Sequence, residues 1–84
     1  MRLSDLAGKE VIDVNNGTSL GTISSPEIEI DTETGRVVSI VLPGRRRGFF
    51  ALGRDPDLAI PWSRVKTIGP ELVLVELPYD MRDV

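Results

Sequence analysis

The chain has 84 residues, 40% of them hydrophobic and 27% charged, which is ordinary usage for one globular domain with a thin core. It contains neither cysteine nor histidine, which excludes disulfides, iron–sulfur clusters, thiolate and imidazole metal sites, and hydrolytic triads. The net charge of −3 is unevenly placed, because residues 36–54 hold five arginines and no carboxylate.

The first predicted elements are a short turn and a strand. Ser4 is expected to cap the turn and Gly8 to end it. Residues 9–14 then extend as a strand that places Ile12 and Val14 on one face.

Turn residues stand at both ends of the second predicted strand. Residues 15–17, Asn-Asn-Gly, tolerate positive φ and predict a tight hairpin into a strand from about Leu20. Pro26 cannot donate a hydrogen bond to a sheet, so the chain is expected to bend near residues 24–26.

The next segment predicts a second hairpin. Residues 27–31 alternate strictly between carboxylates and isoleucines, which predicts Ile28 and Ile30 on the core face. A turn over residues 31–35 leads into a strand at 36–42, which is apolar on both faces apart from one serine. Such a strand is typical of a central position in a sheet.

The rest of the chain is predicted to form four short strands separated by turn residues. They cover residues 49–52, 58–62, 65–68 and 72–77. In the last strand, Leu72 and Leu74 share one face, while Val73 and Val75 share the other. The spacing of the turns predicts an all-β fold, either a small barrel or a sandwich.

Six short motifs occur in this order along the chain: residues 3–11 (LSDLAGKEV), Gly21, 29–31, 34–38, 60–62 and 68–69. Together they resemble the PRC-barrel domain family, and within it the sporulation-associated YlmC/YmxH type. The resemblance implies a strongly bent antiparallel sheet closed into a small β-barrel over residues 1–77, followed by a short tail at 78–84. It also implies a homodimer and no cofactor or reaction.

Domains of similar fold in the photosynthetic reaction centre and in a ribosome-maturation factor belong to larger assemblies. The resemblance therefore implies a non-enzymatic protein-binding adaptor, linked to sporulation, cell division or a related assembly. Since fold alone does not fix function, the identity of the protein partner stays open.

A basic and aromatic segment is the main candidate for partner binding. Guanidinium groups can steer an encounter with an acidic protein surface, or bind phosphates while aromatic rings stack on bases. Solvated arginines at a hairpin tip and aromatic side chains in the core would give the same pattern. The negative net charge favours a protein partner, and an RNA- or ribosome-associated module using residues 44–50 is the alternative. The candidate residues are Arg45, Arg46, Arg47, Phe49, Phe50, Arg54 and Trp62.

Two acidic patterns are interpreted as structural. Residues 31–35 have their glycine one position too early for a calcium loop, and Leu42 stands where a bidentate glutamate is needed. Glu27 and Glu29 share a strand face, which fits solvent-exposed carboxylates better than an acid–base pair. No residue is assigned to catalysis, a cofactor or a metal.

The apolar stretches are short. The longest, residues 37–42, is far below the roughly 20 residues that span a bilayer. Asp5 stands where a signal peptide would begin its apolar region. We therefore expect a cytoplasmic protein that does not insert into a membrane.

Overall fold

The computed structural model describes residues 1–43 and 57–78, which form seven strands and two short 3₁₀-helices and no α-helix. The predicted strand at 49–52 and residues 79–84 of the predicted tail lie outside this part of the chain. The all-β prediction is confirmed. The elements are η1 (Leu3–Leu6), β1 (Glu10–Asp13), β2 (Thr18–Thr22), β3 (Glu27–Asp31), β4 (Arg36–Leu42), β5 (Leu58–Pro61), η2 (Trp62–Arg64), β6 (Val65–Ile68) and β7 (Leu72–Val75).

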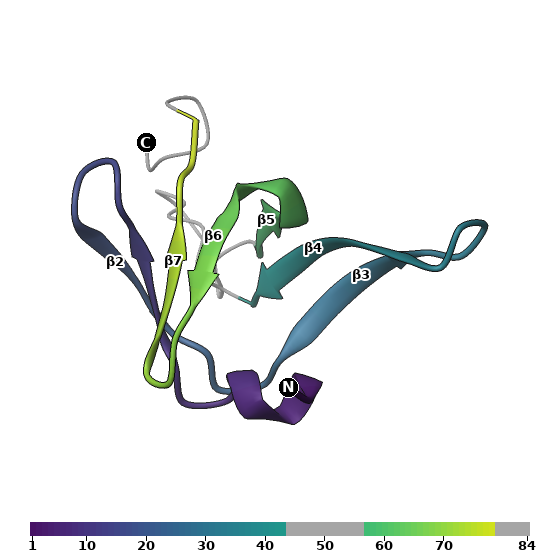
Figure 1. The fold of residues 1–84 in the computed structure, drawn as a ribbon, viewed down its shortest axis with the longest axis horizontal. Helices are drawn as coiled ribbons and strands as arrows, with labels where there is room; N and C mark the ends of the chain where they lie inside the picture. The colour runs from purple at the N-terminus through teal and green to yellow at the C-terminus, as the bar shows by residue number, and fades with distance from the viewer. Residues whose placement is uncertain (44–56, 79–84) are drawn as a thin grey trace, which may run out of the picture.

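The strands form two sheets, with orders β2-β1-β7-β6 and β3-β4-β5 (Figure 1). Every neighbouring pair is antiparallel except β1 and β7, which run parallel. The prediction of one purely antiparallel sheet is therefore wrong, because local turn signals indicate hairpins and cannot indicate how the first and last strands meet. Closure into a barrel stays a prediction, since no ladder joins the two sheets within residues 1–43 and 57–78.

The core lies between the two sheets. β4 is the central strand of its sheet, as predicted, and its second half is buried from Ser39 onward. β7 buries Val73 and Val75 and turns Leu72 and Leu74 away, which confirms the predicted alternation. The buried core cluster consists of Leu6, Val11, Ile23, Ile40, Leu42, Leu58, Ile60, Val73, Val75 and Leu77.

The two predicted hairpin turns are confirmed, and they have the same local chemistry. In each, the backbone N–H of a glycine donates to the carbonyl of an aspartate four residues earlier, at 2.8 Å for Gly17 to Asp13 and 2.7 Å for Gly35 to Asp31. Both glycines have positive φ, 68° and 77°, which other residues adopt only with strain. A carboxylate oxygen of each aspartate also accepts the N–H two residues further on.

A buried lysine joins the start of β1 to the turn between β6 and β7. The Nζ of Lys9 donates to the carbonyls of Gly69, at 2.7 Å, and Pro70, at 2.8 Å. Beside it, the N–H of Glu10 donates to the carbonyl of Glu71 at 3.0 Å. The first and last of the motifs noted above therefore meet in space through the Lys9 side chain.

Replacing Lys9 by methionine is expected to lower the free energy of unfolding by about 2 kcal/mol, because two charge-assisted hydrogen bonds are lost from a buried site. Urea denaturation measures the change. Lys66→Met is the matched control, since Lys66 is exposed and makes one ion pair with Glu76, and it should cost less than about 0.5 kcal/mol. Equal losses in the two variants would contradict the role given to Lys9.

Two local predictions need correction. Ile30 is 51% exposed, because the β3–β4 ladder shifts register between Glu29 and Ile30, while Ile28 packs against the core as predicted. Beyond this irregularity, the end of the β3–β4 hairpin lies outside the core. Ser4 does not cap η1, which begins at Leu3.

The cap of η1 comes from Asp5, whose carboxylate accepts the N–H of Arg2 at 2.8 Å. In β1, Ile12 lies on the side away from the core, while Val11 and Asp13 face the core; Val14, predicted on the same face as Ile12, follows the strand and is exposed. In the described ranges, neither 3₁₀-helix has the length and hydropathy to cross a bilayer.

Candidate interaction surface

Of the predicted partner-binding residues, the structure describes Trp62. It begins η2, which packs against β4, and its side chain is exposed rather than part of the core. The binding role of the others stays a prediction, because they lie outside residues 1–43 and 57–78. They are Arg45, Arg46, Arg47, Phe49, Phe50 and Arg54.

The structure shows a second candidate surface, on the side of the four-stranded sheet that faces away from the core. Leu74 lies opposite Ile12 in the parallel β1–β7 ladder and opposite Thr67 in the β6–β7 ladder. Leu72 lies opposite Glu10 and is 40% exposed. We call the surface formed by Glu10, Ile12, Thr67, Leu72 and Leu74 the outer face.

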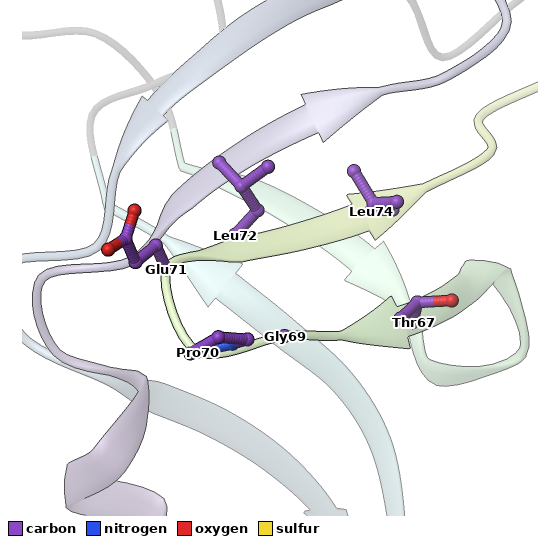
Figure 2. A pocket seen from close by; sticks show the side chains of 6 residues that line it. All are labelled: Thr67, Gly69, Pro70, Glu71, Leu72 and Leu74. Carbon is purple, nitrogen blue, oxygen red and sulfur yellow. The ribbon is translucent and has the colours of Figure 1, made fainter.

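One end of the outer face is hollowed. Figure 2 shows Leu72 and Leu74 pointing the same way from β7, beside the β6–β7 turn. The hollow has a volume of about 260 Å³, enough for one or two partner side chains rather than for a deeply buried ligand. It is lined by Thr67, Gly69, Pro70, Glu71, Leu72 and Leu74.

The local sequence explains why this hollow forms. Gly69 and Pro70 make a tight turn that the N–H of Gly69 closes by donating to the carbonyl of Leu72 at 2.8 Å. Lys9 holds the same turn from the other side through its two carbonyl contacts. The apolar floor therefore lies beside a turn that hydrogen bonds hold in place.

Two glutamates, Glu71 and Glu10, lie at the border of the hollow. Glu71 lines it and is exposed, and Glu10 is next to Leu72 in the ladder, where its Oε2 accepts from the Ser19 hydroxyl at 2.6 Å. The described residues as a whole carry ten carboxylates against five lysines and arginines. An apolar floor with an acidic border favours an apolar side chain flanked by basic residues.

The outer face has the composition of a contact surface. Its side chains, which are exposed or half-buried, are leucine, isoleucine, threonine and glutamate, and they supply apolar contact and charge. Within residues 1–43 and 57–78, no three side chains of the histidine, cysteine, aspartate and glutamate types gather as metal ligands.

The sequence indicated the alternation in β7 but could not indicate which side is the core. Two leucines and two valines alternate there, and either pair could be buried. The choice depends on the pairing of β7 with β1, which places Val11 beside Val73 on the core side. A surface of this kind could have been found only from that long-range pairing.

Comparison with known proteins gives consistent matches along the chain. The family model of the PRC-barrel domain matches residues 1–82. The uncharacterized protein YmxH of Bacillus subtilis is 29% identical over 82 residues, covering 96% of this chain and 94% of that protein. The probable sporulation protein YlmC of Bacillus subtilis is 38% identical over 77 residues, covering 89% of this chain and 90% of that protein.

A third relative, an uncharacterized protein of Clostridium acetobutylicum, is 40% identical over 74 residues and covers 87% of this chain and 80% of its own length.

Proposed function

We propose, from the premise that this chain belongs to the PRC-barrel family, that it is a non-enzymatic adaptor that binds another protein through its outer face. The observation that carries the proposal is the exposed apolar hollow at Leu72 and Leu74. Exposed apolar surface of this kind marks contact sites in proteins, and a preformed one costs little to use.

The proposal also covers the biological process, the location in the cell, the closure of the fold and the oligomeric state. The name of the YlmC relative, a probable sporulation protein, supports a role in sporulation or a related assembly. We place the adaptor in the cytoplasm, with its two sheets closed as one small barrel on the side away from the outer edge of β3. A homodimer is proposed too, because a chain of 84 residues can bury only a small core alone.

Leu72→Glu is expected to reduce recovery of the protein partner about thirtyfold, because truncation or charging of a central apolar contact costs roughly 2 kcal/mol of binding. Affinity purification from the source cells with quantitative mass spectrometry identifies the partner. Titration of the purified partner then measures the change in affinity. The circular dichroism spectrum should stay unchanged, since Leu72 lies outside the core cluster.

Leu3→Glu is the matched control. Leu3 is 46% exposed and lies on η1 rather than on the outer face, so this variant adds the same charge to an equally exposed leucine. It should bind the partner as the unaltered protein does. Equal recovery with all three proteins would refute the outer face as the contact surface. Recovery of RNA in place of a protein, with strong salt dependence, would favour the alternative function.

A further inference from the structure

The outer edge of β3 is a second surface available to a partner. β3 forms one border of the three-stranded sheet, and no strand pairs with its outer side within the described ranges 1–43 and 57–78. Figure 1 shows that the β3–β4 hairpin extends away from the four-stranded sheet. Backbone N–H and C=O groups on such an edge can pair with an added strand.

The side chains along this edge follow a regular pattern. Glu27, Glu29 and Asp31 alternate with Ile28 and Ile30. Glu29 accepts a hydrogen bond from the Ser39 hydroxyl, which fixes one carboxylate beside the ladder. Glu27 and Asp31 are exposed and have no ion-pair partner in the described part of the chain.

The apolar side of the edge is incompletely covered. Ile28 packs against the core, but Ile30, past the register shift, is half exposed. Val38, which lies at the same shift on β4, is exposed as well. A neighbouring strand would cover part of this apolar surface.

The charges select the kind of strand that can bind. Two copies of this chain joined at their β3 edges would bring carboxylates against carboxylates, and like charges facing each other destabilise a strand pair. Pro26 directly before β3 and the register shift within the hairpin are further features that discourage pairing between identical edges. A strand with basic side chains would instead meet opposite charges along its length.

We infer that the β3 edge accepts an extended basic segment of another protein as an added strand, at a site separate from the outer face. Lysine or arginine at alternate positions faces Glu27, Glu29 and Asp31. Apolar residues at the positions between them cover Ile28 and Ile30. The partner is therefore recognised by an alternating basic and apolar pattern together with its backbone hydrogen bonds.

A labelled peptide of alternating lysine and valine is the probe, used with the full chain in a fluorescence anisotropy titration. Glu27→Lys is expected to weaken its binding about tenfold, because an attractive cross-strand pair becomes a repulsive one. Glu76→Lys is the control with the same change in net charge. Since Glu76 follows β7 in the other sheet, where it makes a partly exposed ion pair with Lys66, this variant should change the affinity less than about twofold.

Two further measurements separate strand addition from simple charge attraction. A peptide with the same side chains but N-methylated backbone nitrogens should no longer bind, because it cannot donate to the edge. In nuclear magnetic resonance spectra, the parent peptide should shift the amide signals of residues 27–31. The inference is overturned if the peptide does not bind, if the N-methylated form binds equally well, or if the shifts fall on the outer face.

Discussion

Replacing Ile40 by alanine is expected to lower the free energy of unfolding by about 3 kcal/mol, because it deletes a fully buried side chain from a packed core. Ile40 is 1% exposed and lies in β4, the central strand of its sheet. A domain of this size has a total stability of roughly 4–13 kcal/mol, so the loss is a large fraction of it. Urea denaturation measures this loss of stability. The dependence of the free energy of unfolding on urea concentration should be the same in the two proteins.

Ile30→Ala is the control for this prediction. It removes the same atoms from the same hairpin, but Ile30 is half exposed and lies past the register shift, so we expect a loss below about 1 kcal/mol. Similar losses at the two positions would mean that the far end of the hairpin packs into the core after all.

Replacing Asp13 by alanine is expected to cost about 2–3 kcal/mol, because a carboxylate that is 1% exposed leaves donors without their acceptor. Its Oδ1 accepts the N–H of Asn15 at 3.1 Å and, in a longer contact of 3.5 Å, the N–H of Leu77. Asn15 also donates from its side chain to the carbonyl of Leu77 at 3.1 Å. Asp13 therefore ties the first hairpin to the chain that follows β7.

The second hairpin supplies the comparison for Asp13. Asp31 makes the same turn contacts, but its side chain is exposed, so Asp31→Ala should cost only about 0.5–1 kcal/mol. Thermal unfolding of the two variants gives both losses. If the two aspartates proved equally costly to remove, the turn hydrogen bonds alone would account for the effect and burial would not.

Much of the fold could be predicted from local sequence. Asn-Asn-Gly at residues 15–17 and the glycine that ends the 31–35 turn fixed both hairpins, because positive φ is accessible to few residues. The strand at 65–68 was predicted with its observed bounds, since arginine before it and Gly-Pro after it limit the segment. Short-range chemistry was enough in these places.

The predictions failed where contacts between distant segments determine strand register or burial. Nothing near Ile30 indicates a register shift, because the 27–31 pattern alternates without a break. Local sequence does not indicate that Asp13 is buried, because charged side chains are rarely buried, and its burial involves a contact with Leu77 more than sixty positions away. The outer face was missed for the same reason, as β1 and β7 determine it jointly.

The pairing of β1 with β7 has a consequence for synthesis of the chain. β1 is made well before β7, and each is the other's neighbour in the four-stranded sheet. While the ribosome is still adding residues, β1 and β2 can form only an isolated hairpin, which is marginally stable in water. The four-stranded sheet can therefore form only after β7 has been made, and closing so long a loop slows that step.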